Sequence, residues 1–408
     1  MRPLSAFRFV PLLLSLLLLA LAIPEIASGQ PPAPGLPQLA PEARGRLVQA
    51  AGDPQLPQWQ RDYMLRVAHR GERAARASLT GAGNAARAER ALGVNDGSWI
   101  PPFMDSRYAH SAIYDPVRDR MVVLGGAGAS NDVWALSLTG TPAWTQLTAA
   151  GTLPNARENH GAIYDPVRDR MVVFGGWGGG NYFNDVWALS LAGTPEWTEL
   201  TPTGTPPSAR RYQSTIYDPV RDRMVVFGGL TPPSTRLNDV WALSLAGTPA
   251  WTALTPTGTP PSARVGHSAV YDALRDRIVV FGGYAGLYLR DVWTLSLAGT
   301  PAWTLQAPSG ARPSARNLQS AIYDPARDRM LVCGGYATSS LSDVWALSLA
   351  GTLAWTAVTS TGSPPGGRNS HSAILDPVRD RMVVFGGGGD LGFVNDAWSL
   401  SLAGTPAW

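Results

Sequence analysis

The sequence predicts an all-β protein in which six similar sheets pack around a common axis, a six-bladed β-propeller. The first observation is a repeat that opens each time with an arginine followed three residues later by histidine or glutamine. The opening arginines are 50, 53, 54, 52 and 52 residues apart, a period typical of propellers and solenoids. The second observation is a run of four apolar residues before each Gly-Gly pair, which predicts a strand buried on both faces. The opening arginines are Arg107, Arg157, Arg210, Arg264, Arg316 and Arg368.

Each repeat is predicted to form a four-stranded antiparallel sheet. In the second repeat, residues 160–165 form the first strand and end in a hairpin, Asp-Pro-Val-Arg-Asp-Arg, whose proline pre-sets the turn. Residues 171–174 form the buried second strand. The third strand, residues 186–191, alternates large side chains on one face with smaller ones on the other, so that neighbouring sheets interdigitate. An Ala-Gly-Thr-Pro turn then leads to the fourth strand.

The sequence before the repeats carries different signals. Residues 1–29 combine two early arginines, an apolar run from Phe9 to Ile23 and small residues at 27–29, which predicts a signal peptide cleaved after Gly29. A short membrane anchor is the alternative, but the run is shorter than the ~20 residues that span a bilayer. Residues 30–94 are rich in proline, alanine and arginine, and we expect them to be partly helical or disordered. We therefore expect a secreted or cell-surface protein without a membrane span after cleavage, with the propeller over residues 95–408.

The two ends of the repeat region predict how the propeller closes. The sixth repeat reaches only Ala407-Trp408, before its outer strand is complete. The segment around Trp99 resembles a shortened copy of the return to the next repeat, and we expect it to supply the missing strand, because closure removes exposed sheet edges. The alternative is a longer chain with further repeats.

Composition narrows the functional classes. All 33 basic residues are arginine, and from Asp105 onward 22 arginines face 23 acidic residues, so the repeats are nearly neutral. A nearly neutral repeat array lacks the basic surface that nucleic-acid binding needs. Cys333 is the only cysteine, so no disulfide can form within the chain.

The repeat itself resembles a known family. The Gly-Gly pair after four apolar residues, the tryptophan in Asp-Val-Trp-Ala-Leu-Ser-Leu, the second tryptophan in Pro-Ala-Trp-Thr and the opening Arg-x-x-His resemble the kelch repeat over residues 105–408. This resemblance implies a kelch β-propeller, similar to the central domain of galactose oxidase. The near identity of the repeats favours a bacterial protein formed by recent internal duplication.

Comparison of the repeats with one another predicts where a ligand binds. The hairpins and the Ala-Gly-Thr-Pro turns, at one end of the propeller, are almost invariant, whereas the inserts after Gly-Gly, at the other end, vary in length and chemistry. Loops that vary on one face of a constant scaffold favour a binding role for that face. The kelch resemblance adds that the opening arginines line a pocket at the axis and bind acidic groups. The predicted ligand-binding residues are Arg107, Arg157, Arg210, Arg264, Arg316, Arg368, Trp177, Tyr182, Tyr284, Tyr288, Tyr336 and Phe393.

The arginines have an alternative, structural role. Each blade has an aspartate at the start of its third strand, at the same end of the propeller, and could pair with the arginine there. These aspartates are Asp132, Asp185, Asp239, Asp291, Asp343 and Asp396.

No catalytic residue, metal ligand or cofactor is predicted. Four histidines follow the opening arginines in the same register, but glutamine interrupts them and no carboxylate stands at a ligand spacing, which favours a structural role. We expect a monomeric module that binds a glycan or a peptide. An extracellular enzyme of the galactose oxidase class is the alternative; it needs a copper site and a cysteine crosslinked to tyrosine, whereas Cys333 precedes Gly334 in a predicted core strand. A structural or adhesive surface protein is the third possibility.

Overall fold

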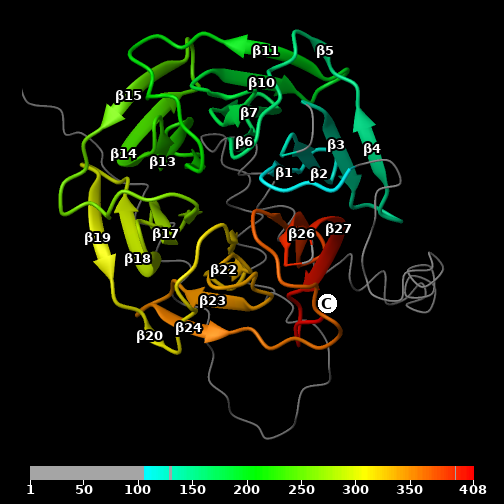
Figure 1. Cartoon of the computed structure of the whole chain (residues 1–408), viewed down its shortest axis with the longest axis vertical. Helices are drawn as coiled ribbons and strands as arrows, with labels where there is room; N and C mark the ends of the chain where they lie inside the picture. The colour runs from blue at the N-terminus through cyan, green and yellow to red at the C-terminus, as the bar shows by residue number, and fades with distance from the viewer. Residues whose placement is uncertain (1–104, 128–130, 391) are drawn as a thin grey trace, which may run out of the picture. The chain divides into compact units, whose positions relative to one another are not determined.

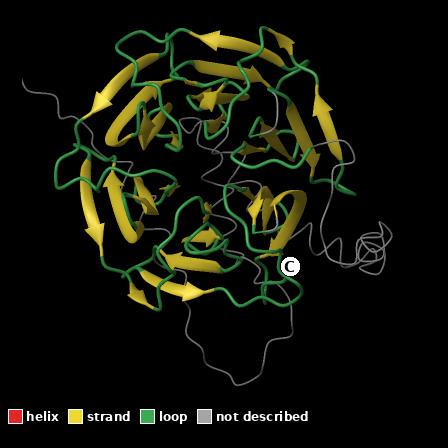
Figure 2. Cartoon of the chain, viewed as in Figure 1, coloured by secondary structure: helices red, strands yellow, loops and turns green. Residues whose placement is uncertain are grey.

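A computed structural model describes residues 105–127, 131–390 and 392–408 of the chain. These residues form strands and no helix, and the strands make six larger sheets arranged in a ring and one small two-stranded sheet (Figures 1 and 2). The predicted all-β, six-bladed propeller is therefore confirmed. The predicted signal peptide, the segment 30–94 and Trp99 lie outside the described residues.

The first three blades follow the chain in order. Blade 1 consists of β1 (Ser111–Asp115), β2 (Arg120–Leu124), β3 (Val133–Ser137) and β4 (Trp144–Leu147). Blade 2 consists of β6 (Gly161–Asp165), β7 (Arg170–Phe174), β10 (Val186–Ser190) and β11 (Glu196–Leu200), with β5 (Ala150–Gly151) added in parallel to β11. Blade 3 consists of β12 (Ser214–Asp218), β13 (Arg223–Thr231), β14 (Thr235–Ser244) and β15 (Ala250–Leu254). The insert of blade 2 forms a small separate hairpin, β8 (Trp177–Gly178) with β9 (Asn181–Tyr182).

The last three blades repeat the arrangement. Blade 4 consists of β16 (Ser268–Asp272), β17 (Arg277–Tyr284), β18 (Tyr288–Ser296) and β19 (Ala302–Gln306). Blade 5 consists of β21 (Ser320–Asp324), β22 (Arg329–Cys333), β23 (Val344–Ser348) and β24 (Ala354–Ala357), with β20 (Ser309–Gly310) in parallel to β24. Blade 6 has three described strands, β25 (Ser372–Asp376), β26 (Arg381–Gly389) and β27 (Gly392–Ser401). Its outer position begins with a bridge between Ser401 and Ala407.

In three blades the second strand continues past the Gly-Gly pair, which the sequence pattern did not predict. β13, β17 and β26 run through the two glycines into the insert, and the register shifts by a bulge at that point. In blade 3 the glycines Gly228 and Gly229 have φ of 66° and 102°. Only glycine adopts these angles without strain, so the pair lets the strand bend and still extend the sheet.

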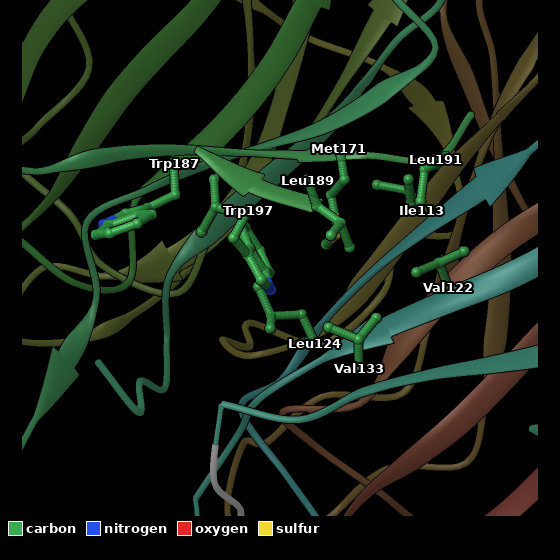
Figure 3. Packing of buried hydrophobic residues seen from close by; sticks show 10 residues of the cluster. Ile113, Val122, Leu124, Val133, Met171, Trp187, Leu189, Leu191 and Trp197 are labelled. Carbon is green, nitrogen blue, oxygen red and sulfur yellow. The ribbon is translucent and has the colours of Figure 1, made fainter. Parts of the chain in front are cut away.

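The core lies between the blades, as the doubly buried second strand predicts. Between blades 1 and 2, Val122 and Leu124 from β2 face Trp187 and Leu189 from β10 (Figure 3). The alternate residues of β7, Val172 and Phe174, point the other way into the layer shared with blade 3. Each second strand thus fills two layers at once, which explains its unbroken apolar sequence.

The ring is closed by the same kind of layer between the last and first blades. Met121 and Val123 of blade 1 pack with Val383, Phe385 and Ala397 of blade 6. In Figure 1 the cyan first blade accordingly lies beside the red last blade.

The hairpins that join the first and second strands form one end of the propeller, here called the hairpin face. In blade 1, Asp115 is fully buried, and its Oδ1 accepts the backbone N–H groups of Val117 and Arg118 at 3.1 Å each. Arg118 then donates to both carboxylate oxygens of Asp169 in the next blade, at 3.1 and 2.6 Å. The equivalent pairs around the ring are Arg118–Asp169, Arg168–Asp222, Arg221–Asp276, Arg275–Asp328, Arg327–Asp380 and Arg379–Asp119. The last of these joins blade 6 to blade 1, so the circle of ion pairs is complete.

Candidate functional site: the rim around the central hollow

The six opening arginines are buried, and each forms an ion pair within its own blade. Arg157 donates to both oxygens of Asp185 at 2.8 Å and to the carbonyl of Gly175 at 3.0 Å. The indole of Trp187 also donates to Asp185, at 2.7 Å. The structure therefore shows the pairing with aspartate that the sequence offered as the alternative. The pairs are Arg107–Asp132, Arg157–Asp185, Arg210–Asp239, Arg264–Asp291, Arg316–Asp343 and Arg368–Asp396.

This pairing changes what the arginines offer a ligand. Their side chains are between 0 and 4% exposed. A guanidinium that is enclosed and bonded to a carboxylate braces the ends of the second and third strands. A direct role in ligand binding stays a prediction for these six residues.

Two residues after each arginine, the backbone forms a closed ring around the axis. These residues have φ between 52° and 62°, in the left-handed region, and five of the six are not glycine. Each donates its N–H to the carbonyl of its counterpart in the preceding blade, at 2.7–3.1 Å. The ring runs through Ala109, Asn159, Tyr212, Gly266, Leu318 and Ser370, and Ala109 closes it by donating to Ser370.

A hollow of about 170 Å³ opens on the axis at this ring. It is lined by the six ring residues and by the next residue of each blade. Those next residues are His110, His160, Gln213, His267, Gln319 and His371.

The histidines and glutamines of this lining join neighbouring blades. Nε2 of His160 lies 2.7 Å from the hydroxyl of Ser111 in the preceding blade, and Nε2 of Gln319 donates to Ser268 at 3.2 Å. Burial, together with the charge of the nearby Arg107, lowers the pKa of His110 to about 3. The histidines are therefore neutral at physiological pH. Among the described residues, no group of three or more His, Cys, Asp or Glu side chains could hold a metal ion.

Beside the hollow, Arg211 lies within an aromatic box. Its guanidinium carbon is 5.5 Å from the ring centre of Trp177, 5.2 Å from that of Tyr182 and 5.1 Å from that of Tyr212. Its Nε is buried without a hydrogen-bond partner among the described residues. The carboxylate of Glu158 is 3.9 Å away, at the limit of an ion pair. Unlike the opening arginines, Arg211 thus has no close bidentate carboxylate partner among the described residues.

A second aromatic group lies farther around the rim, over blades 4 and 5. The rings of Tyr284 and Tyr288 are 5.4 Å apart, and those of Tyr288 and Tyr336 are 6.1 Å apart. Arg236 of blade 3 lies 4.9 Å above Tyr284. This group therefore joins three blades across the face that carries the inserts.

Phe393, the remaining predicted aromatic residue, lies at the junction of the last and first blades. It stacks on Tyr108 with ring centres 4.1 Å apart and is 56% exposed. The structure thus separates the predicted aromatic residues into three groups rather than one pocket.

The sequence pattern missed Arg211, Tyr212 and Arg236. Arg211 and Tyr212 occupy the first and second positions after an opening arginine. Those positions read Tyr-Ala, Glu-Asn, Arg-Tyr, Val-Gly, Asn-Leu and Asn-Ser in the six blades, so they vary as much as the inserts. The same comparison of repeats that identified the inserts as variable would therefore also have identified Arg211 and Tyr212.

Comparison with known proteins agrees with this fold. Residues 97–219, 192–300 and 289–408 match the family described as the KLHDC2/KLHL20/DRC7 Kelch-repeats domain. The chain belongs to this kelch-repeat family. Within the part of this kelch protein that the structure describes, no helix has the length and apolar character needed to cross a membrane.

Several curated proteins are similar to this kelch chain. Host cell factor 1 of Rattus norvegicus and of Homo sapiens are each 28% identical over 327 residues, covering 71% of this chain and 16% of theirs. The Host cell factor homolog hcf-1 of Caenorhabditis elegans is 31% identical over 214 residues, covering 47% of this chain and 27% of its own length. The kelch chain thus spans well under a third of these relatives.

A solved structure supports the fold alone. The chain in "Structure of YjhT" superposes with a TM-score of 0.59 at 17% identity, covering 74% of this chain and 96% of that one.

Proposed function

We propose that this kelch propeller is an interaction module that binds a peptide segment of a partner protein on the rim around the central hollow. The observation that carries the proposal is Arg211. Its guanidinium is held between aromatic rings, its side chain is 24% exposed, and its ion pair with Glu158 is long, at 3.9 Å. Stacking fixes the planar fork, so that a carboxylate that approaches the exposed part of the guanidinium meets donors already in place.

The surroundings of Arg211 fit a peptide. The adjacent hollow of about 170 Å³ has room for a short side chain or a chain terminus. The aromatic groups on both sides offer flat apolar faces with polar edges, the chemistry that is enriched at protein interfaces. Backbone polar groups of the ring are already bonded to one another, so a ligand is recognised mainly by side chains.

A glycan is the second candidate, and a separate observation favours it. Tyr284, Tyr288 and Tyr336 contact one another on the insert side of blades 4 and 5, and their rings suit the apolar face of a sugar. For an enzyme of the galactose oxidase class we derive no step. Among the described residues, no three or more His, Cys, Asp or Glu side chains are grouped where they could hold a metal ion, and burial raises the pKa of Cys333 to about 12, which disfavours its reactive thiolate.

The test is a peptide array and a glycan array probed with the wild-type chain, Arg211→Ala, Arg211→Lys and Arg312→Ala. Arg312 is an exposed arginine away from the hollow and serves as the matched control. Loss of a charge-assisted hydrogen bond is worth about 1.5–3 kcal/mol, so Arg211→Ala should weaken peptide binding by roughly tenfold or more. Arg211→Lys should restore little, because lysine lacks the planar fork.

The outcomes separate the candidates. Binding to peptides that falls only with the Arg211 variants supports the proposal. Binding to glycans that falls with Tyr288→Ala but not with Arg211→Ala supports the second candidate. A wild-type chain that binds neither array removes the binding role altogether.

Location forms a separate part of the proposal. We propose that the protein is exported by residues 1–29 and acts outside the cytoplasm, as a bacterial protein free or held at the cell surface. The N-terminus of the protein recovered from an expressing culture tests this. A first residue of Gln30 supports cleavage after Gly29, and retention of Met1 in the recovered protein contradicts it.

A further inference from the structure

The hairpin face, opposite the rim, exposes a ring of apolar side chains. Five of the nine large hydrophobic residues that are exposed in the described chain occupy the same position, directly before the arginine of the hairpin. Their exposed fractions lie between 45 and 64%. They are Val117, Val167, Val220, Leu274 and Val378, and Ala326 holds the position in blade 5.

The hairpin does not need an apolar side chain at this position. Its turn is held by the buried aspartate, which accepts the backbone N–H groups of Val117 and Arg118 in blade 1. Turns favour polar residues, and a β-branched side chain such as valine is unusual at an exposed turn. The position nevertheless varies among Val, Leu and Ala without ever becoming polar. Because the same position is apolar in every blade, the hairpin face is a candidate contact surface.

The charges beside the ring are already compensated. Each hairpin carries two aspartates and two arginines, and in blade 1 these are Asp115, Arg118, Asp119 and Arg120. Arg118 pairs with Asp115 and with Asp169 of the next blade, and Arg120 pairs with Asp115. The hairpin face is therefore electrically neutral, blade by blade. A strongly charged partner would find no opposite charge to pair with, whereas a neutral apolar partner covers the ring without isolating a charge.

We propose that the hairpin face binds the hairpin face of a second copy of this chain. A copy turned over by a two-fold axis in the plane of the ring presents the same neutral charge and the same apolar ring at the same radius. Because the ring repeats with near six-fold symmetry, one favourable contact is repeated around the axis. Such a face satisfies the self-complementarity that a two-fold interface requires. The sequence alone led us to expect a monomer, and the exposed ring is the observation that argues for a dimer.

The arrangement is independent of the proposed function, because it uses the opposite end of the molecule. A dimer joined through its hairpin faces leaves both rims pointing outward. Two rims on one particle bind a repetitive partner more tightly than one rim does, without any new contact at the rim.

The experiment measures the molar mass of the purified full chain by sedimentation and by light scattering across a range of concentrations. The variant replaces the five exposed residues by alanine: Val117→Ala, Val167→Ala, Val220→Ala, Leu274→Ala and Val378→Ala. Blade 5 already carries Ala326 at this position, so the change is compatible with the fold. The control is Leu153→Ala with Leu305→Ala, which removes two exposed leucines, 46 and 58% exposed, that lie outside the hairpins. We expect the wild type and the control to dimerise, and the dissociation constant of the five-fold variant to rise at least tenfold.

A second measurement guards against an unfolded variant. Single cysteines at Val220 and, separately, at Leu287 on the insert side are treated with a short bismaleimide; the native Cys333 is 2% exposed and does not compete. Val220→Cys should crosslink two copies and Leu287→Cys should not. A wild type that stays monomeric at about 100 μM, or a dimer that the five-fold variant retains, overturns the proposal. A monomer that binds phosphatidylcholine vesicles through the ring also overturns it and assigns the hairpin face to a membrane surface.

Discussion

At the scale of single residues, the third position after the opening arginines shows what two different side chains have in common. Histidine occupies it four times and glutamine twice, and Nε2 makes the contact with the preceding blade in both. Gln319 also donates from Nε2 to the carbonyl of Phe281 at 3.0 Å. A neutral histidine with its proton on Nε2 can make the same donation. The interchange of the two residues therefore follows from hydrogen bonding rather than from metal binding.

This equivalence yields a prediction on pH. Burial is the first cause that lowers the pKa of His110, His267 and His371 to about 3, and it also places that of His160 well below its usual value. As the pH falls below about 6.5, the unfolded chain takes up protons that the folded chain refuses, so stability decreases. The loss should be on the order of 1–2 kcal/mol per histidine at pH 5.

The variant that tests this replaces all four histidines by glutamine, as blades 3 and 5 do naturally. Its free energy of unfolding, measured by urea titration, should stay nearly constant from pH 7 to pH 4.5, while that of the wild type falls. An equal slope in both proteins would show that other groups cause the acid sensitivity.

At the scale of elements, one inter-blade contact departs from the pattern. Serine follows the His/Gln position in five blades, but blade 2 has Gly161 there. A Cβ built on Gly161 would overlap the side chain of Thr215 in blade 3, where the other blades have alanine. Gln213, which would meet that serine, keeps only the bond to the carbonyl of Phe174, at 3.0 Å. The glycine and the threonine thus compensate for each other, because the missing side chain of Gly161 leaves the space that the larger side chain of Thr215 fills.

A double-mutant cycle tests the exchange. Gly161→Ser alone should cost about 1–3 kcal/mol of stability because it overpacks the interface. Combined with Thr215→Ala it should cost much less, since the two changes together recreate the contact of the other blades. Denaturant unfolding of the four proteins gives the coupling energy. Additive effects would mean that the two side chains do not share the space.

Sequence reasoning was most reliable at this scale. The continuous apolar run of residues 171–174 predicted a strand buried on both faces, and Met171, Val172, Val173 and Phe174 are fully buried. Extension of β13 past its Gly-Gly pair was not predictable, because a glycine pair reads equally as a strand end or as a bulge. The role of the site residues was harder to predict than the strands. The sequence does not distinguish a buried, ion-paired arginine from an arginine that binds a ligand. For Arg157 the distinction comes from the structure, in which Asp185 lies 2.8 Å from its guanidinium.

At the scale of the whole molecule, the contact between blades 6 and 1 differs from the other five. Within the described residues the chain passes directly between all other neighbouring blades, whereas here only non-covalent contacts connect them. They include the apolar layer around Phe385, the backbone bond from Ala109 to Ser370 and the ion pair of Arg379 with Asp119. Burial alone would raise the pKa of Asp119, but hydrogen bonds from Arg379 and Tyr114 outweigh it and leave the pKa below its usual value.

Removal of this ion pair should have a distinct consequence. Arg379→Ala and Arg275→Ala remove equivalent bonds, and each should cost about 1–3 kcal/mol. Among the described residues, only the junction that Arg379→Ala affects is not also crossed by the chain. Hydrogen exchange should therefore accelerate in β1 and β25 for Arg379→Ala, and Arg275→Ala should leave both strands protected. Matching exchange patterns for the two variants would show that the closing junction is no weaker than the others.

The backbone ring at the hollow has a mechanical consequence. Its six amides form one loop of donors and acceptors, with no free end at which fraying could begin. Breaking any one of these hydrogen bonds leaves a carbonyl and an amide unpaired at the narrow opening of the hollow, because the neighbouring bonds still hold both groups in place. The opening of the hollow should accordingly be rigid. Its diameter is set by the number of blades, and it should not widen to admit a bulky ligand. A molecule captured there must then conform to the protein, and selection by size would precede any selection by charge.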